Sequence, residues 1–207
     1  MTQRWRMLGC RGCGSAIVES VLVIAGLPYE REEVDYTQKG PARDRLLALN
    51  PLGQVPTVVL PGGKVMSESA AIILHIDETH PAACLLPKVG DPLRSDALRW
   101  LIFVVSAIYP TFTYGDEPEK WIGDAGPMLR EATHAHRRAL WKQLESVTGA
   151  PWFLGETRSA LDLYIGVMTH WRPRRDWFEA ECPKLFAIAK AIDADPRLTT
   201  LWAANFD

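Results

Sequence analysis

The chain has 207 residues, 47% of them hydrophobic, and its 23 basic residues nearly balance its 25 acidic residues. A chain of this length can form one large domain or two small ones, each with its own core. The balanced charge offers no strongly basic surface for nucleic acid, and four scattered cysteines do not form a disulfide framework, which favours a reduced, cytoplasmic protein.

Neither the first residues nor the apolar runs predict a membrane partner. The N-terminal stretch lacks the apolar core of a secretion signal. The longest apolar run, Trp100 to Ile108, is too short to span a bilayer. We therefore expect a globular protein without a membrane anchor.

The first part of the chain, residues 1–81, alternates between strand and helix patterns. In chain order the sequence predicts a strand at Trp5–Leu8, a helix around Val18–Ala25, a strand at Tyr29–Tyr36, a helix at Ala42–Leu49, strands at Thr57–Leu60 and Lys64–Met66, and a helix capped by Ser67 and closed by Pro81. This βαβαββα order is typical of a mixed four-stranded sheet with helices on its faces.

The second part of the chain is predicted to be all helical. Residues 82–92 are rich in proline and irregular, as expected for a linker, and residues 93–207 form the second domain. Helical periodicity occurs at Leu93–Ile108, Met128–Ser146, Leu161–Trp171 and Pro183–Ala194. We expect Pro110 to break the first of these helices.

Two stretches of the sequence resemble the glutathione transferase superfamily. They are NPLGQVPTVVLPGGKVMSESAAIILHIDETHP (Asn50 to Pro81) and FLGETRSALDLYIGVMTHW (Phe153 to Trp171), and the order of elements agrees across nearly the whole chain. The resemblance implies a thioredoxin-like α/β N-terminal domain followed by an all-α domain. It also implies a detoxification enzyme that conjugates the thiolate of glutathione, its co-substrate, to a small and largely apolar electrophile. No other cofactor is implied, and relatives are mostly homodimers.

The segment Gln54-Val55-Pro56 precedes an apolar strand. Proline cannot donate to a sheet ladder, so a strand that begins with proline is unusual. In the resembling family this Val-Pro bond is cis, and the backbone of Val55 pairs with the cysteinyl residue of glutathione. On the residues alone, an ordinary proline at the start of a strand remains the alternative.

Glu68 and Ser69 lie at the predicted start of a helix. Free N–H groups and the positive end of the helix dipole favour a bound carboxylate there, with the Ser69 hydroxyl as a further donor. Glu68 could hold an ammonium group beside it. The γ-glutamyl end of glutathione carries both charges, although a helix with an acid in its first turn is also common without any ligand.

The stretch GCRGCGS (Gly9 to Ser15) lies where the family activates the thiol. Counted back from AGLPYE (Ala25 to Glu30), the tyrosine of some classes falls on Leu8 and the serine or cysteine of others on Gly12, so neither group is present. This stretch resembles bacterial classes with a cysteine or serine near the helix start, and in that alignment the cysteine of the bacterial beta class falls on Gly14 and its following serine on Ser15. Ser15 is therefore the hydroxyl that the resemblance favours.

Cys10 and Cys13 in the same stretch have the spacing of a redox dithiol. The positive potential at the helix start is expected to lower the pKa of the Cys13 thiol. Cys10 precedes the helix, which weakens the prediction of a dithiol that reduces peroxides or mixed disulfides. Two functions remain as alternatives to a conjugating glutathione transferase. One is a glutathione-dependent peroxidase or disulfide reductase that uses Cys13 or Cys10, and the other is a glutathione-binding module without catalytic activity.

The aromatic residues Tyr109, Phe112, Tyr114 and Trp171 are candidates for the second-substrate pocket, or else for the core. Tyr109 falls where the beta class has a histidine, and its phenol could donate to a thiolate. His134 and His136 do not share a helix face, so no metal site is expected. Ser159 and Asp162 have the spacing of a capping box, which is structural in the family.

Overall fold

The computed structural model describes residues 4–206, which form two compact units. Unit 1 contains residues 4–85 and 191–206, and unit 2 contains Leu86–Lys190. The last stretch of the chain thus groups with the first unit, whereas the sequence pattern assigned residues 93–207 to one helical domain.

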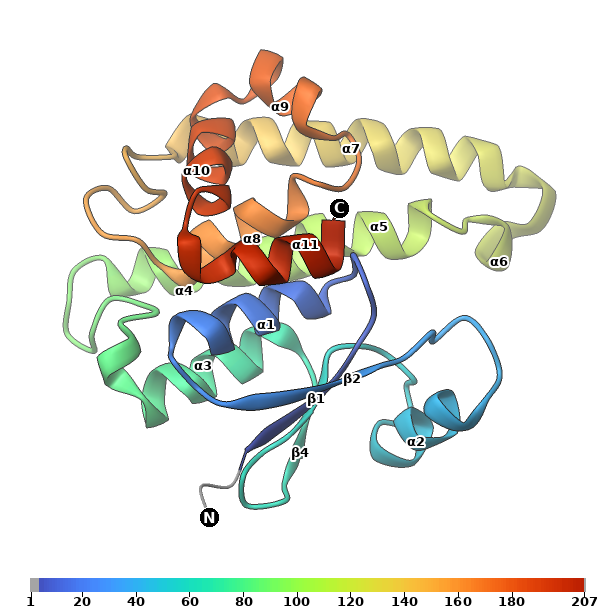
Figure 1. Ribbon diagram of the computed structural model, residues 1–207. Coiled ribbons are helices and arrows are strands. Elements are labelled where there is room, and N and C mark those ends of the chain that lie inside the picture. The colour runs from blue at the N-terminus through green and yellow to red at the C-terminus, as the bar shows by residue number, and fades with distance from the viewer. Residues whose placement is uncertain (1–3, 207) are drawn as a thin grey trace. The chain divides into compact units, whose positions relative to one another are not determined.

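Unit 1 is a four-stranded mixed sheet with helices on both faces (Figure 1). Its elements are β1 (Trp5–Gly9), α1 (Ser15–Ile24), β2 (Tyr29–Glu33), α2 (Pro41–Leu49), β3 (Thr57–Val59), β4 (Val65–Met66), α3 (Ser69–Thr79), short 3-10 turns at Pro81–Ala83 and Pro196–Leu198, and α11 (Thr199–Phe206). The strand order is β2-β1-β3-β4, with β1 parallel to β2 and the other neighbouring pairs antiparallel. This confirms the predicted βαβαββα order.

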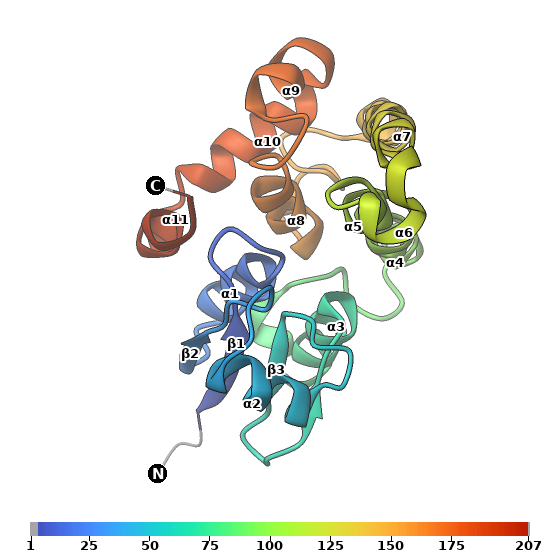
Figure 2. The same ribbon diagram turned by 90° about the vertical axis from the view of Figure 1, so that its right-hand side faces the viewer.

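The central strand β1 has buried side chains on both faces, because helices cover both sides of the sheet (Figure 2). Successive residues of a strand point to opposite faces, so Met7 and Leu8 lie in different layers. Leu8 packs with Val34 and with Leu46 of α2. Helices α1 and α3 cover the other face, and α11, which the sequence did not predict, packs beside α1.

Unit 2 is built from helices. They are α4 (Arg94–Phe103), a π-helical segment (Val104–Ile108), α5 (Tyr109–Gly115), α6 (Glu119–Ile122), a 3-10 turn (Gly123–Ala125), α7 (Gly126–Val147), α8 (Ala160–Met168), α9 (Arg175–Glu181) and most of α10 (Pro183–Asp193), whose end from Ala191 onward belongs to unit 1. The four predicted helices are confirmed, whereas α5, α6 and α9 were not predicted.

The predicted helix break at Pro110 is wrong. The segment Arg94–Gly115 is a continuous helix, and Pro110 lies in the first turn of α5, directly after the π-helical segment. A π-turn shifts the backbone hydrogen bonds, so a proline after it need not interrupt the helix.

By length and composition the helix Arg94–Gly115 is apolar enough to cross a membrane. Core helices share that composition, and Val104 and Ile108 are fully buried within unit 2.

The predicted capping box at the start of α8 is confirmed. The Asp162 carboxylate accepts hydrogen bonds from the Ser159 N–H and hydroxyl at 2.7 and 3.1 Å, and from the Phe153 N–H at 2.8 Å. All of these groups are buried, so the box fixes the loop before α8 to the helix.

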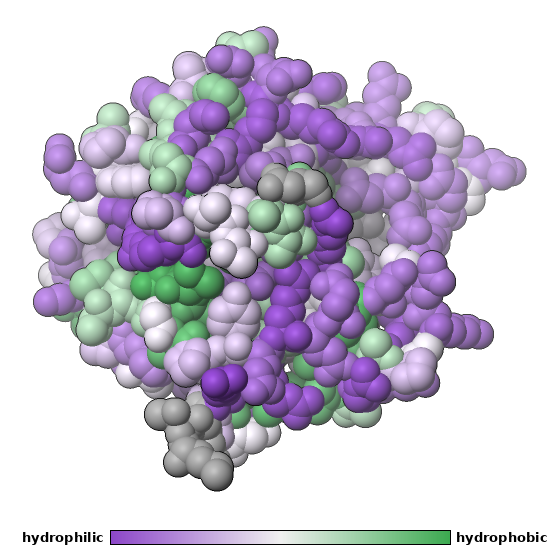
Figure 3. Space-filling view, in the orientation of Figure 1, coloured by the Kyte–Doolittle hydropathy of each residue, from purple (hydrophilic) through white to green (hydrophobic). Residues whose placement is uncertain are grey.

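On the surface, polar side chains predominate on the face shown in Figure 3, where apolar side chains form small separate patches.

Candidate functional site

The strand register of unit 1 brings three segments to one edge of the sheet. Leu8 of β1 lies opposite Thr57 of β3, and Val58 of β3 lies opposite Met66 of β4. Because neighbouring antiparallel strands run in opposite directions, the residues after β1 and after β4 both lie beside those before β3. The loop after β1, the backbone at Val55 and the start of α3 therefore converge at this edge.

The loop after β1 is a tight turn that contains both cysteines. The Cys13 N–H donates to the Cys10 carbonyl at 3.2 Å, and Gly12 between them has a φ of 68°. A positive φ at the third residue of a turn favours glycine. Both thiols are reduced, and each donates to the carbonyl oxygen of Arg11 at 3.6 Å. The two sulfur atoms thus lie on the same side of the turn, which we call the dithiol turn (residues 10–13).

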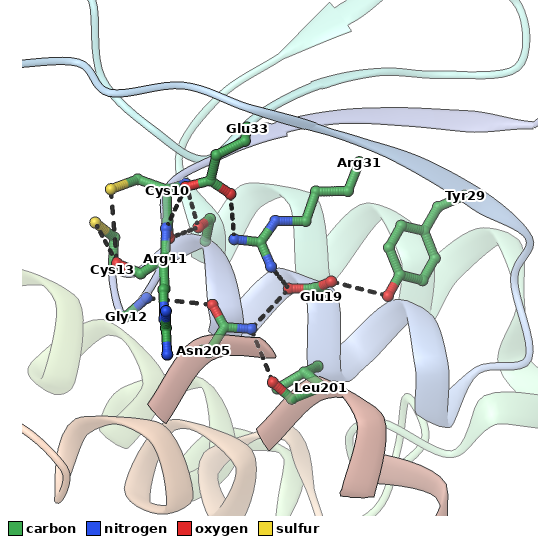
Figure 4. A network of polar contacts seen from close by, with 11 residues as sticks. Cys10, Arg11, Gly12, Cys13, Glu19, Tyr29, Arg31, Glu33, Leu201 and Asn205 are labelled. Atoms are coloured by element: carbon green, nitrogen blue, oxygen red, sulfur yellow. Dashed lines mark hydrogen bonds and ion pairs between the residues drawn. The ribbon is translucent and has the colours of Figure 1, made fainter. Parts of the chain in front are cut away.

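The central N–H groups of the dithiol turn bind side chains from elsewhere in unit 1 (Figure 4). The Arg11 N–H donates to Glu33 Oε1 at 2.7 Å. The Gly12 N–H donates to Asn205 Oδ1 at 3.2 Å. Glu33 belongs to β2 and Asn205 to α11, so an adjacent strand and the last helix hold the turn from two directions.

Glu19 of α1 joins these two supports. Its buried carboxylate accepts hydrogen bonds from Tyr29 at 2.9 Å, from Arg31 at 3.2 Å and from the Asn205 side-chain amide at 3.2 Å. Arg31 also contacts Glu33 at 2.7 Å. Removal of any member therefore leaves a polar or charged group in this partly buried network without a partner.

Ser15 holds the dithiol turn through hydrogen bonds with the backbone of Cys10. Its Oγ accepts from the Cys10 N–H and donates to the Cys10 carbonyl, both at 3.0 Å, and the side chain is fully buried. A Cβ atom on Gly9 would lie 2.9 Å from this Oγ, so only glycine fits there. Because the hydroxyl hydrogen is bonded to the Cys10 carbonyl, a bond from Ser15 to a glutathione sulfur would require the loss of this contact, and the thiol-activating role stays a prediction.

The expected low pKa of the Cys13 thiol is not found. Helix α1 begins at Ser15, so both cysteines precede it. Burial raises the pKa of Cys13 strongly and that of Cys10 as well, and the negative charge of Glu33 acts in the same direction on both. A hydrogen bond between the two thiols lowers the pKa of Cys10 and raises that of Cys13.

Tyr36 is a further group at the dithiol turn, and sequence reasoning missed it. Its side chain forms a hydrogen bond with Cys13 that lowers the pKa of that thiol, although burial outweighs this effect. Tyr36 lies in the loop after β2, and no local pattern links it to the turn. Only the parallel pairing of β1 with β2, which aligns Gly9 with Glu33, brings this loop to the cysteines.

The segment before β3 has the conformation that the resemblance implied. The Val55-Pro56 bond is cis. The Gln54 carbonyl accepts from Asn50 at 3.2 Å and from Thr57 at 2.8 Å, which fixes the loop, while the Gln54 side chain is exposed. Within residues 4–206, no hydrogen bond joins the backbone of the half-buried Val55 to another residue. Its N–H and C=O are therefore available to an extended ligand.

The start of α3 has an unusual backbone conformation and no side-chain cap. The helix begins at Ser69 and its N-cap is Glu68, so the expected cap at Ser67 is wrong. Glu68 is exposed, has a φ of 65°, and no side chain caps the helix. A positive φ at a residue other than glycine is uncommon, and such residues cluster at ligand sites.

Three of the four predicted aromatic pocket residues form one cluster in unit 2. The ring centroid of Trp171 lies 5.8 Å from that of Tyr109 and 5.3 Å from that of Phe112, in edge-to-face contacts. Tyr114 instead packs against Trp121, with centroids 4.8 Å apart. We call Tyr109, Phe112 and Trp171 the aromatic cluster.

Arg137 of α7 supports the aromatic cluster, and sequence reasoning missed it. Its guanidinium lies 3.5 Å from the centroid of the Phe112 ring. It donates to the Thr111 hydroxyl and carbonyl at 2.8 and 2.6 Å, and to the Arg172 carbonyl at 3.3 Å. Burial lowers the pKa of Arg137 to about 10.

Within residues 4–206, no group of three or more His, Cys, Asp or Glu side chains is arranged to hold a metal ion.

Comparison with known proteins agrees with this fold. Residues 15–79 match the family model of the glutathione S-transferase N-terminal domain. The chain is 36% identical to the uncharacterized GST-like protein YncG of Escherichia coli K12, over 97% of this chain and 98% of that protein. It is 34% identical to glutathione S-transferase U4 of Arabidopsis thaliana, over 77% of this chain and 67% of that protein.

Solved structures share the same architecture. A glutathione transferase homologue from Sulfitobacter, determined with bound glutathione, superposes with a TM-score of 0.82 at 20% identity, over 97% of this chain and 98% of that one. A sphingomonad glutathione S-transferase complexed with glutathione has a TM-score of 0.79 at 24% identity, with the same coverage. A thioredoxin-like sheet accompanied by helices is thus the shared fold. The chain belongs to the glutathione transferase family.

Proposed function

We propose that the chain is a glutathione transferase that joins the glutathione thiolate to a small, largely apolar electrophile. The observation that carries this proposal is the start of α3 at Glu68, which has a positive φ and no side-chain cap, on the same sheet edge as the backbone of Val55. Relatives that bear the name glutathione S-transferase support it.

The proposed binding mode uses the charges at the start of α3. The γ-glutamyl carboxylate accepts hydrogen bonds from the first N–H groups of the helix and from Ser69, where the helix dipole favours an anion. Glu68 pairs with the ammonium group. The cysteinyl residue extends along Val55 as an additional strand, and the exposed Gln54 side chain lies beside it.

The proposed chemistry relies on positioning and electrostatics. Because the Ser15 hydroxyl and the N–H groups of the dithiol turn already have partners, the positive end of α1 is the proposed stabiliser of the glutathione sulfur. A hydrogen bond from Tyr109 to that sulfur stays a prediction. The aromatic cluster is the proposed contact surface for the electrophile. A cytoplasmic homodimer is the expected state.

The binding mode can be tested by calorimetry with glutathione. Glu68→Gln and Ser69→Ala should together weaken binding roughly 10- to 100-fold, because charged hydrogen bonds of about 1.5–3 kcal/mol are lost. Glu78→Gln, an exposed residue near the other end of α3, is the matched control and should bind like the unaltered protein. Unchanged affinity in the double variant would refute the placement. Binding without conjugation of an aryl halide would instead identify a binding module.

A further inference from the structure

We propose that Cys10 and Cys13 form a reversible disulfide and exchange it with small-molecule disulfides. This thiol–disulfide activity is separate from conjugation at the glutathione site. It assigns a function to the two cysteines that the proposed transferase chemistry does not use.

The geometry of the dithiol turn carries this proposal. Cys10 and Cys13 are the first and fourth residues of a hydrogen-bonded turn. The Cα atoms of such residues lie less than about 7 Å apart, and disulfides typically join Cα atoms that are about 4.4–6.8 Å apart. Both thiols converge on the Arg11 carbonyl and contact each other. A bond between the sulfur atoms therefore requires little movement of the backbone.

The supports around the turn hold the two sulfur atoms in this arrangement. Glu33, Asn205 and Ser15 each bind its backbone, and all three belong to regular elements of unit 1. A rigid turn favours reaction between the cysteines over reaction of each with a separate molecule, because their effective concentration is high.

The hydrogen bond between the thiols sets the order of the two steps. It favours the thiolate of Cys10 and disfavours that of Cys13. The Cys10 thiolate attacks one sulfur of a disulfide RSSR, forms a mixed disulfide and releases RS⁻. The Cys13 thiolate then attacks the Cys10 sulfur and releases the second RS⁻. The protein loses two electrons and two protons, and RSSR becomes two RSH.

Neither cysteine lies within α1, so this site differs from a redox dithiol whose first cysteine begins a helix. Burial and nearby acids disfavour both thiolates, so the exchange should be slow at neutral pH and should accelerate as the pH rises. If the helix dipole instead stabilised the thiolate, the exchange rate would already be high at neutral pH and would change little as the pH rises.

The test uses the reduced full-length chain with the Cys84→Ser substitution, which removes an exposed cysteine. The probe is 2-hydroxyethyl disulfide, because it lacks a γ-glutamyl group and so does not depend on the proposed glutathione site. Peptide mass spectrometry should show a Cys10–Cys13 link that dithiothreitol removes. In the Cys13→Ala variant, Cys10 should instead accumulate the mixed disulfide, and in the Cys10→Ala variant Cys13 should react at least tenfold more slowly than Cys10 does.

Two outcomes would overturn the proposal. One is the absence of the Cys10–Cys13 link in oxidised protein, and the other is an equal yield of mixed disulfide on Cys10 with and without Cys13. A parallel arm with oxidised glutathione separates the two proposals. If the glutathione site is misplaced, Glu68→Gln should leave the rate in this arm unchanged, while the link formed with 2-hydroxyethyl disulfide persists.

Discussion

The side-chain oxygen of Asn205 accepts a hydrogen bond from the Gly12 backbone N–H at 3.2 Å, although 193 positions separate the two residues. The Asn205 amide nitrogen donates to Glu19 and to the Leu201 carbonyl, at 3.2 and 3.0 Å. A single buried amide therefore fixes the last helix to the dithiol turn, and its oxygen and nitrogen have distinct partners.

Replacement of this amide should loosen the turn. We expect Asn205→Leu to lower the free energy of unfolding by about 1–3 kcal/mol, because the Gly12 N–H loses its acceptor in a partly buried site. Hydrogen exchange at Gly12 should accelerate. The exposed Thr200 lies on the same helix, and Thr200→Ala should change neither quantity. Unaltered exchange at Gly12 in Asn205→Leu would show that the bond does not hold the turn.

A structural role for Ser15 predicts a defect in stability. Ser15→Ala removes both hydrogen bonds to Cys10, so urea denaturation should show a loss of about 1–3 kcal/mol. The pKa of bound glutathione, followed by thiolate absorbance, should stay unchanged in the fraction that remains folded. A rise in that pKa would identify Ser15 as the activating hydroxyl.

The thiols of the dithiol turn should alkylate slowly at neutral pH. Since the pKa of Cys10 is raised by burial, its reaction with iodoacetamide should reach half its maximal rate above the free-thiol value of about 8.5. Cys13→Ala should move this midpoint higher, because the hydrogen bond that favours the Cys10 thiolate is lost.

The same shift links folding to pH. A thiol whose pKa is raised by folding stabilises the folded state fully below the unfolded pKa, and this contribution is lost as the pH rises toward the folded value. The free energy of unfolding should therefore decrease above about pH 8.5. The decrease should be smaller in a variant in which both Cys10 and Cys13 are alanine. A Cys10 midpoint below 8.5 would contradict both expectations.

Removal of the Asp162 carboxylate should strongly destabilise unit 2. Asp162→Ala leaves the buried N–H groups of Phe153 and Ser159 without an acceptor. We expect a loss of about 3–5 kcal/mol in thermal or urea unfolding. Glu156→Ala, at an exposed position of the preceding loop, should change stability by less than about 0.5 kcal/mol. Equal effects of the two substitutions would exclude a structural role for the capping box.

Local sequence patterns were sufficient to predict most of the strands and helices of unit 1. Strands and helices there are separated by glycine and proline turns, as at Gly26-Leu27-Pro28 and Pro61-Gly62-Gly63, and the periods of their apolar residues differ clearly. The same local rules failed at Pro110, because a π-turn earlier in the chain accommodates the proline. The helices α6 and α9 are too short to show a full apolar period.

The candidate site was only partly predictable for a different reason. Val55 and Glu68 lie in a contiguous motif, so the resemblance located them together. The groups that hold the dithiol turn come from β2 and α11, and only the tertiary fold brings them together. Spacing alone suggested that Cys10 and Cys13 are close, but it could not show that burial raises the pKa of both thiols.

Helix α11 has a consequence for the order in which the molecule can mature. Synthesis proceeds from the N-terminus, so residue 205 leaves the ribosome after all of unit 2 has been made. Domains often fold as they emerge, but the hydrogen bond from the Gly12 N–H to Asn205 forms only after Asn205 has been synthesised. While residues 86–190 are translated, Glu33 and Ser15 can therefore hold the dithiol turn, but its third support, Asn205, is still missing.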